Sequence, residues 1–372
     1  MSHEAFERTP ARVYWELTRA CDLACRHCRA EAMPERAADE LTTEECERVL
    51  REFAGAGPPP PHVVFTGGDP LKRPDLVELV RCGVGLGLGV SVAASATPAL
   101  SRDVVEALES AGVSAMSLSL DGSTPARHDG IRGVLGCFGW TLVAAQRIVN
   151  AGIPLQINTL VTAETEPDLE EIAKVVARLG ASRWSLFFLV PVGRGRTLRA
   201  LSARECETTL RWLAARTRAW PFTVTTTEAP HYRRVLIESR LAAGLWGADS
   251  RDNVVARSFG IRDGNGIMFI AANGDVMPSG FLPLVAGNAR DVEATDIYRY
   301  ASLFRSLRTP EAFHGRCGVC GFRAVCGGSR ARAYAATRDP IGEDPLCAHE
   351  PAMAPRGAAH NEFGEGRGSL LE

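Results

Sequence analysis

Six strand-like stretches alternate with helical stretches between Val13 and Val190. The expected strands are 13–17, 62–66, 90–95, 115–120, 155–161 and 184–190, and the expected helices between them are 43–54, 75–84, 102–111, 138–151 and 169–179. Strands that alternate with helices predict a parallel sheet with right-handed crossovers. Six such units are too few for a complete eight-stranded barrel. The alternation therefore predicts an α/β fold with a parallel sheet.

Three closely spaced cysteines, Cys21, Cys25 and Cys28, follow the first expected strand. In barrels of this kind the chemistry lies at the C-terminal ends of the strands, which is where these thiols belong. Thiolates are the usual ligands of iron–sulfur clusters. Three of them can hold three irons of a four-iron cluster and leave the fourth iron open to a small molecule. A zinc site is the alternative, but zinc usually takes four protein ligands.

The spacing Cys-x3-Cys-x2-Cys resembles the signature of the radical S-adenosylmethionine enzymes. The resemblance implies that the open iron chelates the amino and carboxylate groups of S-adenosylmethionine. An electron from the cluster then breaks a C–S bond, and the resulting 5'-deoxyadenosyl radical takes a hydrogen atom from the substrate. It also implies an open six-stranded (β/α)6 partial barrel, and an external reductant such as flavodoxin or ferredoxin.

A glycine pair follows the second expected strand in the segment Gly67-Gly68-Asp69-Pro70. Glycine lets the backbone approach a ligand closely, although an ordinary strand-to-helix turn would also explain the pair. The segment resembles the Gly-Gly-Glu-Pro motif of the family, which hydrogen-bonds the methionine amino group. Asp69 departs from the usual Glu, so the resemblance leaves the role of its carboxyl group open.

Two further segments resemble the family: Ser-Leu-Asp-Gly, which contains Ser119 and Asp121, and His-Asp-x-x-Arg-Gly, which contains Arg132. The resemblance implies that Arg132 holds the methionine carboxylate by a charge-assisted pair, and that Ser119 hydrogen-bonds the carboxylate or the ribose. Asn158 is expected near the ribose, and Val192 against the adenine. The alternatives are a solvated loop charge for Arg132, a turn-forming role for Asp121 and a buried strand amide for Asn158.

A second group of four cysteines occupies the C-terminal part of the chain, at Cys317, Cys320, Cys326 and Cys347. A structural zinc site would also suit the first pair. The surrounding sequence, with Gly-Gly-Ser-Arg-Ala-Arg-Ala-Tyr after Cys326, resembles the auxiliary-cluster domain called SPASM. It is closest to the enzymes of heme d1 and alternative heme synthesis. The resemblance implies a second [4Fe–4S] cluster, so the expected cofactors are S-adenosylmethionine and two [4Fe–4S] clusters.

The chain departs from the full SPASM pattern, which carries seven cysteines and two clusters. Ser279 stands where one additional cysteine is expected, and Ser329 or Arg330 where another is expected. The cluster nearer the barrel therefore lacks its ligands. The outer cluster keeps four, which leaves no open iron and suits it to structure or electron transfer.

The sequence predicts five regions: an N-terminal tail (1–11), the radical S-adenosylmethionine partial barrel (12–200), a helical bridge (201–255), the SPASM/twitch-like auxiliary cluster domain (256–350) and a disordered tail (351–372). Residues 221–252 are expected to be irregular. A hairpin over 266–278 is expected to turn at Asn273-Gly274. A helix is expected over 296–307, and no internal repeat is apparent.

Composition indicates which partners and which cellular location to expect for the protein. The chain has no apolar run of 18 residues and no apolar N-terminal signal, so we expect no membrane partner and a cytoplasmic location. Its formal net charge of −2 gives no indication of nucleic acid. Seven of the 11 cysteines fall into the two groups, which favours clusters over disulfides.

Three reaction classes remain open. Modification of a tetrapyrrole, such as oxidative loss of propionate carboxylates, is suggested by the Arg-Ala-Arg-Ala-Tyr segment, and Arg194, Arg196 and Arg199 could pair with such carboxylates. Maturation of a ribosomal peptide is the second class, made less favourable by the short stretch before the first strand. Radical dehydration, epimerisation or decarboxylation of a sugar or natural product is the third. A non-enzymatic electron-transfer or scaffold protein would not need the nucleotide motifs.

Cys137 is the one further residue with a candidate chemical role. It lies soon after the fourth expected strand, and a thiol there could donate a hydrogen atom to a substrate radical. The alternative is a small buried residue at a helix start, because free cysteine is commonly buried and inert.

Overall fold

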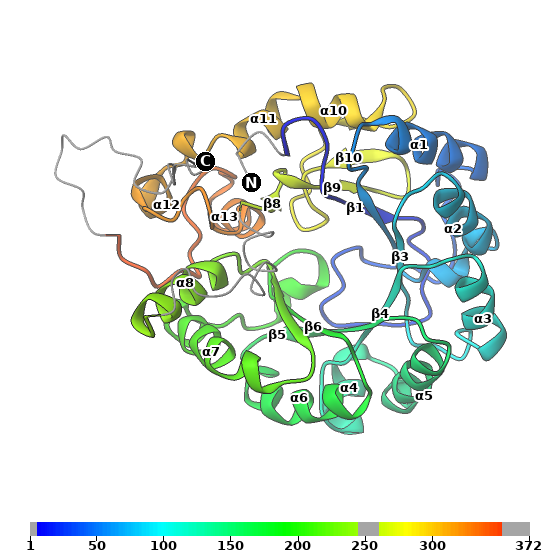
Figure 1. Ribbon diagram of the computed structural model, residues 1–372, viewed down its shortest axis with the longest axis horizontal. Coiled ribbons are helices and arrows are strands. Elements are labelled where there is room, and N and C mark those ends of the chain that lie inside the picture. Colours follow the sequence, from blue (N-terminus) through cyan, green and yellow to red (C-terminus); the bar gives the residue numbers. More distant parts are fainter. Residues whose placement is uncertain (1–5, 245–259, 352–372) are drawn as a thin grey trace, which may run out of the picture.

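The computed structural model describes residues 6–244 and 260–351 (Figure 1). One sheet runs through this part of the chain in the order β11-β10-β9-β1-β2-β3-β4-β5-β6-β7, with β8 beside β9. Its strands are β1 (Arg12–Glu16), β2 (His62–Thr66), β3 (Val90–Ala93), β4 (Ala115–Ser119), β5 (Leu155–Val161), β6 (Arg183–Phe188), β7 (Thr223–Thr227), β8 (Arg262–Asp263), β9 (Gly266–Ile270), β10 (Asp275–Met277) and β11 (Gly287–Asn288). The run β1 to β7 is parallel throughout, as the alternating pattern predicts.

Helices form an outer ring around the curved sheet (Figure 1). They are α1 (Thr43–Gly55), α2 (Leu76–Gly85), α3 (Arg102–Ser110), α4 (Pro125–Arg132), α5 (Cys137–Asn150), α6 (Leu169–Arg178), α7 (Ala203–Arg216), α8 (Tyr232–Ala242), α10 (Ala294–Tyr300), α11 (Ser302–Arg308), α12 (Gly315–Val319) and α13 (Arg330–Thr337). Short 3-10 turns η2 (Pro70–Lys72) and η4 (Gly193–Thr197) follow β2 and β6. No helix in the described residues is long and apolar enough to cross a membrane.

The hydrophobic core lies between the sheet and the helix ring. Alternate side chains of β1, such as Val13 and Trp15, are fully buried on this outer face, where the Trp15 ring meets Phe53 of α1 edge-on at 6.4 Å. Burial of large side chains of this kind supplies most of the stability of an α/β layer. The opposite face of the sheet carries the other alternate residues, among them Tyr14 of β1 and Gln156 of β5, which keep partial exposure. The inner face of the barrel is therefore more polar than the outer one.

Local sequence signals set many of the boundaries. The expected strands over residues 62–66 and 155–161 begin and end where β2 and β5 do, and most of the other expected elements differ by a few residues. Thr42 caps α1, and its side chain and that of Glu45 complete a reciprocal capping box. The hairpin over 266–278 is confirmed as β9 and β10, and Gly274 at its turn has a φ of 90°, which glycine adopts without strain.

Three expectations that the sequence suggested about the fold are wrong. The parallel series does not stop at six strands, because β7 adds a seventh beside β6, and β9 pairs in parallel with β1 on the other side. The stretch 221–252 is not irregular, since it contains β7 and α8, although its residues 245–252 lie outside the described part. The run Thr-Val-Thr-Thr-Thr of β7 is rich in β-branched residues and was a usable strand signal. The expected helix over 296–307 is two helices, α10 and α11, because Ala301 between them has extended backbone.

The structure describes residues 6–11 of the expected N-terminal tail and only residue 351 of the expected C-terminal tail. Phe6 in the expected N-terminal tail is buried, and its carbonyl accepts a 2.6 Å hydrogen bond from the Tyr298 hydroxyl. The expected disordered tail lies outside the described residues from position 352 onward.

Candidate active site

The loop that carries the first three cysteines is held by the loop after β2. Gly68 N donates to Thr18 O at 2.8 Å, and Asp69 N donates to Ala20 O at 2.7 Å. A Cβ on Gly67 would lie 2.4 Å from Thr18 O, and one on Gly68 would lie 2.4 Å from Ala20 O. Real Cβ atoms do not approach a carbonyl so closely. The glycine pair is therefore required for the contact between the two loops. In that contact Gly68 N and Asp69 N donate hydrogen bonds to the cysteine loop.

The three thiols gather in one small apolar cluster. Cys21 and Cys25 are buried there, and Cys28 packs against them half-buried. Leu23 N donates to the Cys21 sulfur at 3.3 Å, and Ala32 N to the Cys28 sulfur at 3.4 Å. Donors of this kind stabilise a negatively charged thiolate ligand. Burial, the largest influence, raises the pKa of Cys21, so without a cation the thiol form is favoured.

Arg132, at the end of α4, connects the cysteine loop to β4. Its Nη1 lies 3.5 Å from the Cys25 sulfur, and its Nη2 lies 2.7 Å from Asp121 Oδ2. Asp121 Oδ1 in turn accepts from Leu160 N at 2.7 Å. Burial alone would lower the pKa of the arginine, but the carboxylate of Asp121 and the Cys25 thiol raise it. Arg132 is thus a buried, charged group of the site rather than a solvated loop residue.

Two histidines beside this pair are neutral. Burial, followed by the charge of Arg132, lowers the pKa of His27 and of His128 to about 4. His128 Nδ1 accepts from Asp121 N at 3.0 Å, which fixes the segment that follows β4. The positive charge of Arg132 therefore faces Asp121 without competition from an imidazolium.

Several buried polar atoms around the cysteine loop have no partner within the described residues. They are Asp69 Oδ2, His27 Nδ1, Arg132 Nε, and Arg194 Nε and Nη2. Buried polar groups are nearly always paired, because an unpaired one costs the full desolvation penalty. Burial also raises the pKa of Asp69 to about 6. Groups of both charge types are thus available to a ligand that carries an ammonium and a carboxylate, as S-adenosylmethionine does.

The other expected nucleotide contacts have mixed placements. Ser119 and Asn158 are register partners on β4 and β5 and lie on the inner face. The Asn158 side chain accepts from Gln156 Nε2 at 2.7 Å. Pro70 is buried at the start of η2, and Val192 is half-buried just before η4.

Cys137 is the first residue of α5 and is 1% exposed. It belongs to the apolar cluster that contains Cys21 and Cys25. Burial raises the pKa of its thiol to about 11. The thiol is therefore un-ionised and packed beside the cysteine loop.

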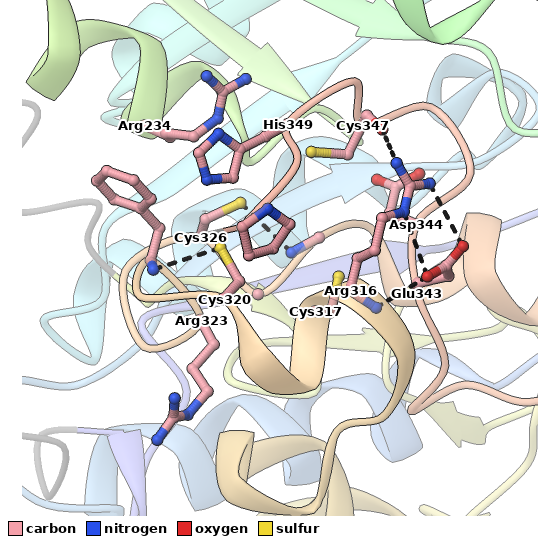
Figure 2. A pocket seen from close by; sticks show the side chains of 14 residues that line it. Arg234, Arg316, Cys317, Cys320, Arg323, Cys326, Glu343, Asp344, Cys347 and His349 are labelled. Carbon is pink, nitrogen blue, oxygen red and sulfur yellow. Dashed lines mark hydrogen bonds and ion pairs between the residues drawn. The ribbon is translucent and has the colours of Figure 1, made fainter. Parts of the chain in front are cut away.

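The four C-terminal cysteines line one pocket in the region of α12 and α13 (Figure 2). Figure 2 shows their sulfur atoms turned toward a common space that Arg234, Arg316 and His349 border. The Cys320 sulfur accepts from Phe322 N at 3.4 Å, and the Cys326 sulfur from Gly328 N at 3.4 Å. The convergence of four thiols and their N–H donors suits an anionic metal cluster. No group of three or more His, Cys, Asp or Glu side chains in residues 6–244 and 260–351 meets the geometry of a single-ion site.

The Arg-Ala-Arg-Ala-Tyr segment lies beside this pocket. Arg330 donates to Gly342 O at 2.6 Å, and its Nη2 lies 3.6 Å from the Cys317 sulfur. Arg332 pairs with buried Asp344 at 3.0 Å and donates to Glu228 O at 2.6 Å. Both guanidinium groups are used internally. The segment therefore organises the second thiol site and is not free to bind a substrate carboxylate.

Of the three arginines expected to meet substrate carboxylates, only Arg194 faces the site. Arg199 lies on the surface, 3.6 Å from Glu205, and Arg196 is exposed. Arg194 N donates to Cys28 O at 3.0 Å, and two of its guanidinium nitrogens are the buried, unpaired atoms named above.

Ser279 and Ser329, which stand where cysteines are expected in the full domain, meet on one carboxyl group. Ser279 Oγ lies 3.4 Å from Glu228 Oε1, and the Ser329 hydroxyl bonds Glu228 Oε2. Burial, then the neighbouring charge of Asp263, raises the pKa of Glu228 well above its usual value. A protonated carboxyl group thus joins the two serines. Sequence reasoning missed Glu228, whose visible signal in the structure is a φ of 58° at the end of β7.

Gly68→Ala should displace the cysteine loop, because the new Cβ would collide with backbone at Ala20. We expect about a hundredfold loss of 5'-deoxyadenosine formation, the scale of a roughly 1 Å misplacement of reacting groups. Iron content after anaerobic reconstitution and nucleoside yield measure the effect. Gly85→Ala, where nothing lies within 4 Å of the new methyl, is the control. Wild-type behaviour of both variants would contradict the assignment.

Glu228→Gln should remove a pH dependence of stability. A carboxyl group with a raised pKa holds its proton longer in the folded than in the unfolded state, so its contribution is complete below its ordinary value of 4.5 and is lost as pH rises. We expect wild type to lose stability relative to the variant progressively as pH rises above 4.5. Urea unfolding at a series of increasing pH values tests it, with exposed Glu106→Gln as control. A constant difference would refute a protonated Glu228.

Comparison with known proteins agrees with the site. A model of the Radical SAM superfamily matches residues 15–176. The chain is 38% identical over 345 residues to AdoMet-dependent heme synthase of Oleidesulfovibrio alaskensis, covering 92% of this chain and 88% of the relative. It is 37% identical to the Methanosarcina barkeri protein of the same name, covering 93% and 99%.

The fold resembles the crystal structure of Streptococcus suis SuiB bound to S-adenosylmethionine, with a TM-score of 0.70 and 18% identity over 92% of this chain and 78% of that one. This likeness concerns the fold alone. The identity to the heme synthases extends over nearly the whole of both chains. On that ground the protein belongs to the Radical SAM superfamily and is a radical S-adenosylmethionine enzyme.

Proposed function

We propose that the enzyme removes propionate carboxylates from a tetrapyrrole oxidatively, with conversion of the side chains to vinyl groups. The observation that carries the proposal is the identity of 38% over 92% of the chain to a protein named AdoMet-dependent heme synthase. Each turn removes one hydrogen atom, one electron and carbon dioxide from the propionate. The hydrogen atom ends on 5'-deoxyadenosine, and the electron must leave through the protein.

The first site would hold S-adenosylmethionine and the cluster that cleaves it. In this proposal Cys21, Cys25 and Cys28 bind a [4Fe–4S] cluster, which supplies the electron for the cleavage. Arg132 would hold the methionine carboxylate, because it is charged, buried and unpaired at Nε. Asp69 Oδ2 is the unpaired acceptor available to the ammonium. The remaining proposed nucleotide contacts are Gly67, Gly68, Pro70, Ser119, Asp121, Asn158 and Val192.

The role proposed for the glycine pair changes in one respect. Gly68 N and Asp69 N already donate to the cysteine loop, so these N–H groups are not available to the ligand, whereas the Gly68 carbonyl and Asp69 Oδ2 are. Gly68 O accepts from Ser95 Oγ at 3.3 Å and keeps a second lone pair. A carbonyl acceptor suits an ammonium group.

The second site would hold the other [4Fe–4S] cluster and accept the electron that leaves the substrate. Its four thiols would saturate the irons, which favours electron transfer over substrate binding. The carboxyl network at Glu228 supports a count of two clusters, since it joins the serines that stand in place of the missing cysteines. The proposal thus keeps the partial barrel (12–200) and the auxiliary domain (256–350) as functional units. An external flavodoxin or ferredoxin would reduce the first cluster.

The hydrogen-donor role of Cys137 stays a prediction, and an oxidative reaction does not need it. Its thiol is 1% exposed and shares an apolar cluster with Cys21 and Cys25. That packing supports the structural alternative. Peptides and other natural products are the alternative substrates of the same radical, but no contact in the described residues favours them over a tetrapyrrole.

The cluster assignment predicts about eight irons per chain after anaerobic reconstitution. Replacing Cys21, Cys25 and Cys28 together by Ala should leave about half of that iron and abolish nucleotide cleavage. Replacing Cys317 and Cys320 by Ala should also halve the iron but spare uncoupled cleavage of S-adenosylmethionine. Mössbauer spectroscopy and nucleoside analysis separate these results. A value near twelve irons would show that non-cysteine ligands hold a third cluster.

The substrate proposal is tested by incubating the reduced enzyme with S-adenosylmethionine and an iron porphyrin that carries four propionates. We expect products that have lost one and then two formic acid equivalents, each matched by one 5'-deoxyadenosine. Mass spectrometry and liquid chromatography measure both. Nucleoside formation that the porphyrin does not stimulate, with no change in porphyrin mass, would exclude the proposed substrate.

A further inference from the structure

The loops at the thiol end of the barrel contact one another. The loops after β1 and β2 are joined by backbone hydrogen bonds, and the loop after β6 reaches them through Arg194 N and Cys28 O. A Cβ on Gly193 would lie 2.5 Å from Cys28 O, so this contact is also tight. A substrate that entered from this end would have to break these loop contacts.

Three basic residues face inward at the opposite, N-terminal ends of the strands. Arg12 and His62 are register partners at the starts of β1 and β2, and Arg183 begins β6 across the barrel. Their strand neighbours Val13, Val63 and Trp184 are fully buried on the outer face, so strand alternation turns the basic side chains inward. The three groups thus share the mouth of the barrel that the cysteine loop does not close.

Arg183 lacks the partners that a buried guanidinium normally has. Its Nε is buried with no hydrogen bond, and its Nη1 reaches only Gln156 Oε1, at 3.5 Å. No carboxylate is among the groups that shift the pKa of Arg183, which are Arg12 and Tyr14. Burial, then the charge of Arg12, lowers the pKa of Arg183, so the two cations lie close enough to repel each other.

The third member of the group is held neutral. His62 Nε2 lies 2.8 Å from Ser91 Oγ. Burial, then the charges of Arg12 and Arg183, lowers the pKa of His62. Arg12 is exposed and Arg183 is half-buried. Their like charges repel each other, and an anionic ligand between them would relieve that repulsion. The arrangement is therefore that of an anion site rather than of a structural salt bridge.

We propose that Arg12 and Arg183 bind carboxylates of the substrate that do not react, at the N-terminal mouth of the barrel. This inference rests on the proposed function for the identity of the substrate. A five-residue strand such as β1 spans roughly 13 Å from its first to its last Cα. A macrocycle with carboxylates on several edges can extend over that length, with one carboxylate at the arginines and another propionate near the cysteine loop. Guanidinium groups suit this task because they bind carboxylates bidentately.

Titration of the holoenzyme with an iron porphyrin tetrapropionate, followed by its Soret absorbance, measures the binding directly. We expect Arg12→Gln and Arg183→Gln each to raise Kd about tenfold, the effect of losing a charge-assisted hydrogen bond, and the double variant about a hundredfold. Arg183→Lys should lie between wild type and Arg183→Gln. Exposed Arg81→Gln on α2 is the matched control. Iron content and the thermal unfolding midpoint verify that each variant is folded.

The tetramethyl ester of the same porphyrin separates charge from shape. It should bind wild type weakly, and the arginine substitutions should not weaken it further. Equal Kd values for wild type and variants, or equal sensitivity with the ester, would overturn the inference while leaving propionate loss intact. Charge-dependent binding without any change of the porphyrin would instead overturn the proposed reaction and leave the anion site. Absence of porphyrin binding to wild type would overturn both.

Discussion

The contact between the loops after β1 and β2 is the constraint on which the site depends. Two N–H groups of the second loop donate to carbonyls of the first, and neither glycine can carry a side chain there. The cysteine loop is therefore positioned by backbone rather than by mobile side chains. The loop after β6 joins the same contact at Cys28. Three strands that are far apart in sequence thus fix one set of thiols at the C-terminal end of the barrel.

One arginine organises the charged groups around the thiols. One arginine, Arg132, reaches both the Cys25 sulfur and Asp121, and its charge helps to keep His27 and His128 neutral. The atoms left unpaired include donors and an acceptor. A zwitterionic ligand satisfies such a mixture better than a simple ion does, because each of its charged ends meets an opposite partner.

The C-terminal region is organised around one buried carboxyl group, that of Glu228. Two serines stand where a fuller domain has cysteines, and a buried carboxyl group joins them. Hydrogen bonds that Arg332 donates then tie this network to Leu189 O, just after β6, and to Asp344 beside the four thiols. The remaining four-thiol pocket is built into the barrel through these contacts. An electron acceptor there would be held rigidly relative to the substrate, as efficient transfer requires.

Much of this protein can be predicted from its sequence. Hydrophobic alternation, a capping box and the Asn-Gly turn are local signals, so the strand and helix order and most boundaries follow from short segments. The spacing of Cys21, Cys25 and Cys28 indicates the cofactor chemistry for the same reason. The strand count was wrong because β7 follows a helix and a Trp-Pro pair that read as the end of the series.

Tertiary structure decided the roles that depend on distant partners. The sequence alone did not distinguish a solvated Arg132 from a buried one, because the answer lies with Asp121 and with Cys25, 107 residues away. It placed the segment with Arg330 and Arg332 beside the second cysteine group, and the structure adds their partners, Gly342 and Asp344. It gave no signal for Glu228, or for the pair Arg12 and Arg183, because closure of the barrel brings these groups together. Local pattern determines which elements form, and packing between elements determines which charges are neutralised and which are left for a ligand.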